Sequence, residues 1–351
     1  MNLKKSALSC SLLVLISTIA FSQNYIVMVK SAANKKWGYV TNTGEVVAQP
    51  SYERCYEFSS EGLAPIYDPK NKEFYFITTK GSRIATDIKG FKLMDRMGFA
   101  LEGFNDGLIP VKHNDKWGFL NKDGKVAIPA KYDEVTGFGS GHAVATLGKK
   151  LFIINTSGEE TPVESGILEV RKFSDNLAPF RAADKKFGYL DVSGKIVIKP
   201  QFESVGYFKD GIAWAKTTDG NVGYLGKDGE WIITPQFNTA GNFDSESGLA
   251  RVKTGSEWGY VNKEGKVIRK TDTMVWEDFS NGLAMGKKDG LFGYFNDKGE
   301  WAIQPQYDGG RDFKNGFAAV KKGGKWGIID KSGNWVIKAE YDGIKDMELV
   351  N

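Results

Sequence analysis

Few side chains in this 351-residue chain have the types and spacing that catalysis or metal binding requires. The two histidines, His113 and His142, have no Cys, second His or repeated acid near them at metal-ligand spacing. Cys55 lies among aromatic residues, a setting typical of a buried small hydrophobe rather than a nucleophile. Acids recur at equivalent turn positions, such as Asp123 and Asp228, which indicates turn formation rather than one acid–base pair. The sequence therefore predicts no catalytic residue, no cofactor and no metal site.

Besides catalysis and metal binding, the sequence can be examined for a surface of varied side chains that binds a partner. A run of the form Gly-Leu-Ala-x-Val-Lys recurs along the chain, and its x position is the most variable column. Because alternate strand residues face opposite sides, this residue points away from the side on which its constant neighbours pack. Several prolines in the column predict an edge strand, since proline cannot donate to a ladder. The column consists of Pro65, Pro110, Val144, Pro179, Trp214, Arg251, Met285 and Ala319.

Two places are therefore candidates for a recognition surface. In the variable column the candidate residues are Trp214, Arg251 and Met285. The alternative is that the column varies only because its side chains face solvent. The second place is an insertion near residues 83–104, with Phe91 and Arg96 as its candidate residues. Insertions in repeat proteins map to loops, often on the binding face, although drift or a simple cap is the alternative.

These candidates are carried by a repeated unit. The motif Trp-Gly-Tyr, as in Trp37–Tyr39, returns about every 35 residues, and self-similarity at a fixed period defines a repeat architecture. Aligning the units on the glycine that closes the following turn gives nine copies. These glycines are Gly44, Gly81, Gly124, Gly158, Gly194, Gly229, Gly265, Gly299 and Gly333.

Each unit is predicted to form a β-meander of short strands, because its runs are β-branched or aromatic and bounded by Gly, Asn and Asp. The turn Asn121–Gly124 has the residues of a type I turn with a Gly bulge. Closing the hairpin there places Leu120 opposite Val126, Gly118 opposite Ile128 and Phe119 opposite Ala127. Both faces are then apolar, so we expect the hairpin to lie between neighbouring sheets, with the repeated Trp packed in the core.

The repeated order of Lys-Trp-Gly-Tyr, Asn-Lys-x-Gly-Lys-Val-Ile, Pro-Gln-Tyr-Asp and Phe-x-Asn-Gly-Leu-Ala resembles the WG-repeat (KWG) family of bacterial tandem-repeat proteins. The resemblance covers residues 24–351 and implies an all-β repeat array without an assigned catalytic residue. The units containing Phe74 and Leu151 depart from the pattern because they lack the Trp-Gly pair.

Two architectures would bury the faces of such units. One is an open β-solenoid of stacked meanders, and the other is a closed β-propeller-like ring. We favour the solenoid because the unit is small for a four-stranded blade and nine blades make an unusual ring. The absence of a polar capping unit at either end favours the ring instead.

The first 22 residues are predicted to be a signal peptide. Lys4 and Lys5 precede an apolar run from Ala7 to Phe21, and Ala20–Ser22 resembles a cleavage site before Gln23. Removing this segment leaves 45 basic and 43 acidic residues with interspersed signs, which argues against binding nucleic acid. It also leaves Cys55 as the one cysteine and no second apolar stretch long enough to span a membrane.

We therefore expect an exported, non-enzymatic repeat scaffold in the periplasm, at the cell surface or outside the cell. Its expected partner is a protein or a cell-surface polymer. One alternative is a surface carbohydrate-binding protein that uses exposed aromatic residues, and a hydrolase of unknown class is another. The aromatic candidates are Trp214, Trp231, Trp276, Trp301 and Trp335, although pairing in the hairpin would pack Trp231, Trp301 and Trp335 against Leu225, Phe295 and Ile329.

Overall fold

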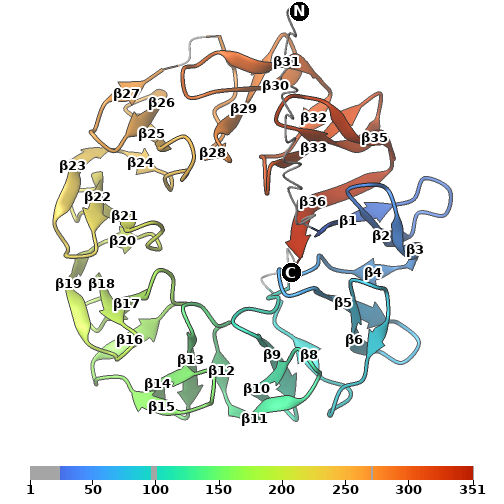
Figure 1. The fold of residues 1–351 in the computed structure, drawn as a ribbon. Helices are drawn as coiled ribbons and strands as arrows, with labels where there is room; N and C mark the ends of the chain where they lie inside the picture. Colours follow the sequence, from blue (N-terminus) through green and yellow to red (C-terminus); the bar gives the residue numbers. More distant parts are fainter. Residues whose placement is uncertain (1–23, 96–100, 270–271, 351) are drawn as a thin grey trace, which may run out of the picture.

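The computed structural model describes residues 24–95, 101–269 and 272–350 of the chain. These ranges contain no helix and form nine antiparallel sheets of four strands each. The sheets are arranged as blades around a ring, with their short inner strands toward the centre (Figure 1). The predicted signal peptide, residues 1–22, and Arg96 lie outside the described residues.

Eight blades are built from four consecutive strands. The innermost strands are β4 (Arg54–Cys55), β8 (Lys92–Leu93), β12 (Glu134–Val135), β16 (Ile167–Val170), β20 (Ser204–Val205), β24 (Thr239–Ala240), β28 (Phe279–Ser280) and β32 (Gly309–Gly310). The second strands are β5 (Leu63–Asp68), β9 (Leu108–His113), β13 (His142–Leu147), β17 (Leu177–Ala182), β21 (Ile212–Lys216), β25 (Leu249–Thr254), β29 (Leu283–Lys288) and β33 (Phe317–Lys322). The third strands are β6 (Glu73–Thr78), β10 (Lys116–Asn121), β14 (Lys150–Asn155), β18 (Phe187–Asp191), β22 (Val222–Gly226), β26 (Glu257–Asn262), β30 (Leu291–Phe295) and β34 (Lys325–Asp330). The outermost strands are β7 (Arg83–Ile84), β11 (Val126–Tyr132), β15 (Glu160–Pro162), β19 (Ile196–Phe202), β23 (Trp231–Phe237), β27 (Val267–Ile268), β31 (Trp301–Tyr307) and β35 (Trp335–Tyr341).

The ninth blade joins the two ends of the described chain. It takes its innermost strand, β36 (Gly343–Val350), from the C-terminal side and its other strands, β1 (Asn24–Lys30), β2 (Trp37–Thr41) and β3 (Val46–Tyr52), from the N-terminal side. The pairing of β1 with β36 runs from Asn24 opposite Val350 to Lys30 opposite Gly343. The protein is therefore all-β, and its units close into the propeller-like ring rather than the open solenoid that we favoured. Because β1 and β36 satisfy each other, neither end needs a polar capping unit.

The hairpin of the repeat has the predicted turn but a different register beyond it. Gly124 adopts a φ of 75°, the left-handed conformation expected at the bulge, and Leu120 lies opposite Val126 as predicted. Phe119, however, pairs with Ile128, so Gly118 does not lie opposite Ile128 and Phe119 does not lie opposite Ala127. The bulge inserts Ala127 as an extra residue, which shifts the register by one.

The glycine of the Trp-Gly-Tyr motif allows a close backbone approach. A Cβ at Gly118 would lie 2.5 Å from the carbonyl oxygen of Ile128 and 2.6 Å from the backbone nitrogen of Ala130. Such distances are shorter than van der Waals contact, so any other residue would force β10 away from β11.

The run that carries the variable column is not an edge strand, so this prediction was wrong. In each described blade it forms the second strand, flanked by a short inner strand and by the Trp-Gly strand. The carbonyl group of Pro65 accepts a hydrogen bond from Tyr56, just beyond the two-residue strand β4. The missing N–H of Pro65 would point toward the inner strand. Proline is tolerated because that strand has already ended at this position, so no ladder hydrogen bond is lost. Five members of the column are buried, namely Pro65, Pro110, Val144, Pro179 and Ala319.

Neighbouring blades are joined by the aromatic residue that ends the Trp-Gly-Tyr motif. Tyr224 is fully buried, and its hydroxyl donates to the carbonyl of Gly241 in the next blade at 2.9 Å. Its ring also packs on Phe243, with 4.7 Å between centroids. The same hydroxyl-to-carbonyl bond, always to the residue 17 positions later, is made by Tyr39, Tyr189, Tyr260 and Tyr294.

The repeated tryptophans pack at the border of the core. Trp37, Trp117 and Trp326 are half-buried against the apolar clusters of their blades. Trp258 lies near the charged groups of Arg251 and Lys253, which are 5.0 and 5.4 Å from a ring centroid. These tryptophans therefore pack against the core without entering it, and the fully buried position is the tyrosine two residues later.

Replacing Tyr224 with Phe should lower the free energy of unfolding by about 1–2 kcal/mol, because the partly buried carbonyl of Gly241 loses its donor. Urea denaturation followed by tryptophan fluorescence measures this change. The matched control is Tyr207→Phe, since Tyr207 is exposed and its hydroxyl bonds to no residue in the described part of the chain. Equal losses for the two variants would contradict a structural role for the Tyr224 hydroxyl.

Candidate functional site: the inner wall of the ring

The inner end of each blade holds one variable residue between two constant features. In most blades a residue whose carbonyl can accept the tyrosine hydroxyl comes first, then the variable residue, then a buried aromatic residue such as Phe208 or Phe313. In the closing blade the buried Met347 takes the place of the aromatic residue. We call the variable positions the inner column. Its members are Glu57, Gly103, Gly137, Lys172, Tyr207, Asn242, Asp278, Asp312 and Asp346.

The inner column divides the wall into two halves of different chemistry. Four acids, Asp278, Asp312, Asp346 and Glu57, come from four successive blades and form the acidic half. The other half carries Lys172, Tyr207 and Asn242, together with two glycines.

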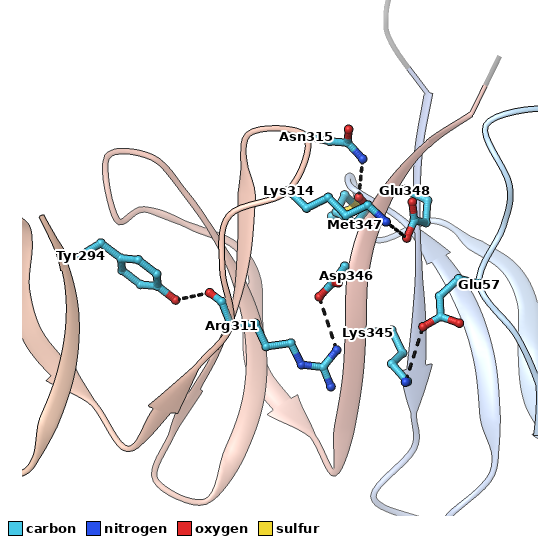
Figure 2. A network of polar contacts seen from close by, with 9 residues as sticks. All are labelled: Glu57, Tyr294, Arg311, Lys314, Asn315, Lys345, Asp346, Met347 and Glu348. Carbon is cyan, nitrogen blue, oxygen red and sulfur yellow. Dashed lines mark hydrogen bonds and ion pairs between the residues drawn. The ribbon is translucent and has the colours of Figure 1, made fainter. Parts of the chain in front are cut away.

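The acidic half is held together by contacts across the seam where the ring closes (Figure 2). On one side of β36, Arg311 lies 3.3 Å from Asp346 and Lys314 lies 2.6 Å from Glu348. On its other side, Lys345 lies 3.5 Å from Glu57 of the first blade. The closing strand is therefore paired electrostatically with both neighbouring blades.

Asp312 is the most perturbed acid of this half. Crowding by surrounding protein atoms and the negative charges of Glu277, Asp278 and Asp346 raise the pKa of Asp312 to about 6, although Arg251 opposes the shift. The side chain keeps an exposed surface, since it borders a cavity of about 440 Å³ on the inner wall. This carboxyl group therefore titrates nearer to neutral pH than an ordinary aspartate.

The other half of the wall borders a cavity of about 760 Å³. Tyr207, Asn242 and Lys209 lie beside it, with Arg171 and Lys172 from the preceding blade. Lys172 is bound at 2.7 Å to Glu102, which is only 3% exposed and also accepts a hydrogen bond from Asn105.

Glu102 comes from the predicted insertion, which the structure places on the inner wall. Residues 83–104 supply β7 and β8, and an additional bridge pairs Asp95 with Leu101. The N–H of Glu102 then donates to the carbonyl of Met94 at 2.9 Å. The sequence singled out this segment but not Glu102 or Lys172, because their pairing joins residues 70 positions apart.

The candidate residues named from the sequence are not brought together. Trp214 is half-buried against Gly206, and Phe91 is a core residue, 2% exposed, stacked on Phe76. Arg251 and Met285 border the acidic half, where Arg251 lies 3.0 Å from Asp278 and Met285 lines the cavity beside Asp312. The inner column, which sequence reasoning missed, is the position at which the variable side chains share one surface.

The aromatic residues considered for sugar binding are half-buried, except Trp335, which is 37% exposed. Trp231, Trp301 and Trp335 pair with Leu225, Phe295 and Ile329, as predicted from the hairpin. Trp276 is half-buried beside Tyr260, with 5.4 Å between ring centroids.

The residues considered for catalysis or metal binding lie in structural surroundings. Burial raises the pKa of the Cys55 thiol to about 12, which keeps it protonated. Nδ1 of His142 lies 3.0 Å from the carbonyl oxygen of Ser140. Within residues 24–95, 101–269 and 272–350, no three His, Cys, Asp or Glu side chains form a group that could hold a metal ion.

The blades, their repeated aromatic contacts and the closing pair of strands define a β-propeller-like repeat protein. A model of the WG containing repeat matches residues 37–67, 100–117, 117–150, 187–221, 223–257, 292–326 and 326–348, more than half of the chain. The chain belongs to this WG-repeat family, as its motifs indicated.

One of the similar solved structures shares the fold at low sequence identity. A crystal structure titled "the eukaryotic initiation factor" is 11% identical, with a TM-score of 0.59 over 93% of this chain and 98% of that one. AztD from Citrobacter koseri, 12% identical, gives a TM-score of 0.45 over 93% of this chain and 97% of its own. The computationally designed Ika8 protein, also 12% identical, gives a TM-score of 0.42 over 80% of this chain and 93% of its own. No curated protein matches the sequence.

Asp312→Asn should raise the melting temperature at pH 7.5 and have little effect near pH 4. A folded-state pKa of about 6, above the usual 3.8, means that ionising Asp312 costs stability as the pH rises through this interval, with the full cost above pH 6. Melting curves of both proteins between pH 4 and 7.5 measure the difference. A gap that stays constant with pH would contradict the assigned pKa.

Proposed function

We propose that the protein is an exported, non-enzymatic scaffold that binds a protein or a cell-surface polymer through the inner wall of its ring. The observation that carries this proposal is the inner column. The residues on either side of it are fixed by blade-to-blade contacts, whereas its members differ in charge, size and polarity. Repeat proteins commonly use varied positions on a constant framework as an extended binding surface.

A hydrolase is the second candidate, because Glu277, Asp312 and Asp346 border one cavity and the pKa of Asp312 is raised. We prefer the binding role because the neighbouring acids are engaged by arginines. Asp346 lies 3.3 Å from Arg311, and Arg251 lies between Glu277 and Asp278 at 3.5 and 3.0 Å. A carboxylate that is paired with an arginine contributes to a charged binding surface but is not available as a general base.

Export is part of the proposal and rests on the N-terminal sequence. Among the described residues, no helix has the length and apolarity needed to cross a membrane. We expect protein isolated from the producing cell's envelope or medium to begin at Gln23. Intact mass spectrometry measures this, and a mature chain that retains Met1 through Ser22 would contradict cleavage.

Binding by the inner wall can be tested by affinity capture from the source cell envelope. The inner variant combines Tyr207→Ala, Asn242→Ala and Asp312→Asn, and it should lose captured partners because all three side chains border the wall cavities. The outer variant combines Val197→Ala, Lys199→Ala and Ile232→Ala on the outer strands β19 and β23, and it should capture the same partners as the wild type.

Circular dichroism and melting curves establish that both variants are folded before capture. Equal loss in the two variants would show that the inner wall is not the binding surface. Capture of no partner by the wild-type protein from either the envelope or the medium would contradict the binding function itself.

A further inference from the structure

We propose that the 760 Å³ cavity beside Tyr207 binds a polysaccharide whose sugar units carry carboxylate groups, such as a chain of uronic acids. This inference rests on the proposed binding function and names the ligand class for one half of the inner wall. The volume lies within the range of about 300–1,000 Å³ that is usual for ligand pockets.

The aromatic face comes from Tyr207. Its side chain is 42% exposed and lines the cavity, while the next residue, Phe208, is fully buried. No other aromatic ring in the described ranges stacks on it. A planar apolar surface in an otherwise polar cavity suits the C–H face of a pyranose ring, and a tyrosine supplies this surface at low conformational cost.

The charge of the cavity favours an anion. Arg171, Lys172 and Lys209 line it, against the two acids Glu102 and Glu169. Lys172 neutralises Glu102 at 2.7 Å, and Glu169 is shared by Arg171 at 3.3 Å and Arg181 at 3.2 Å. Lys209 has no ion pair with the described residues, so its ammonium group is available to a ligand carboxylate.

A neutral polar group lies one blade further along. Asn242 is exposed at the cavity and its amide makes no hydrogen bond within the described chain, so it can both donate to and accept from sugar hydroxyl groups. The acidic half of the wall, from Asp278 to Glu57, repels an anion and directs it to the side of Tyr207.

The short inner strands also disfavour an acidic peptide that binds as an added strand. A bound peptide strand would need an open strand edge for backbone pairing. The inner strands around the cavity, β12, β20 and β24, have two residues each, and β16 has four. They therefore offer side chains rather than a continuous backbone edge.

The test is calorimetric titration of the full chain with oligogalacturonate and with the same oligomer fully methyl-esterified, which keeps the sugar and removes its charge. Tyr207→Ala should weaken oligogalacturonate binding about tenfold, whereas Tyr207→Phe should change it less than about twofold. Lys209→Gln should weaken it about threefold, while Lys199→Gln, an exposed lysine on the outer strand β19, should leave it unchanged.

The proposal is overturned if oligogalacturonate does not bind, if the ester binds equally well, or if poly-glutamate binds equally well and shows the same dependence on Tyr207. Such a result leaves the capture experiment with the inner variant as the separate test of the wider binding function. Loss of captured partners together with absent oligogalacturonate binding would keep the wall as a binding surface and exclude this ligand class.

Discussion

The ring depends on one contact repeated between most of its blades, the buried aromatic residue of one blade against the inner end of the next. The ring of Tyr294 meets Phe313 edge to face at 4.8 Å, and its hydroxyl donates to the carbonyl of Arg311 at 2.7 Å. The apolar contact is non-directional, but the hydrogen bond is not, so together they fix both the distance and the rotation between blades. Where Phe119 stands at this position, the contact with Phe138 remains at 4.9 Å without the hydroxyl.

This framework separates the residues that hold the fold from those free to differ. The constant aromatic residue and the carbonyl acceptor enclose the inner column, so a change at Tyr207 or Asp312 leaves the contact between blades in place. A row of charges can therefore vary from blade to blade without changing the architecture. Some column members are exceptions because they also join blades: Asp346 pairs with Arg311 at the seam, Asp278 with Arg251, and Lys172 with Glu102.

Local features of the fold could be predicted from the sequence. The turn at Gly124 and the pairing of Trp231 with Leu225 follow from residue types within a few positions. Ring closure could not be predicted in this way, because it depends on an angle accumulated over nine blades and on β1 meeting β36. The inner strands, mostly two residues long, leave no period in the sequence, so neither they nor the inner column beside them can be predicted from it.

The closing blade also sets an order of events in synthesis. Among the described strands, β1 to β3 leave the ribosome first, yet the strand that completes their sheet, β36, follows the other eight sheets. Until then β1 presents an unpaired edge with the apolar residues Val27 and Val29, which are fully buried in the finished ring. The earliest part of the described chain is thus the last to be completed. A nascent or shortened chain would expose β1 as an unpaired apolar edge that promotes aggregation. Binding by a chaperone, or early degradation by a protease, would prevent this aggregation.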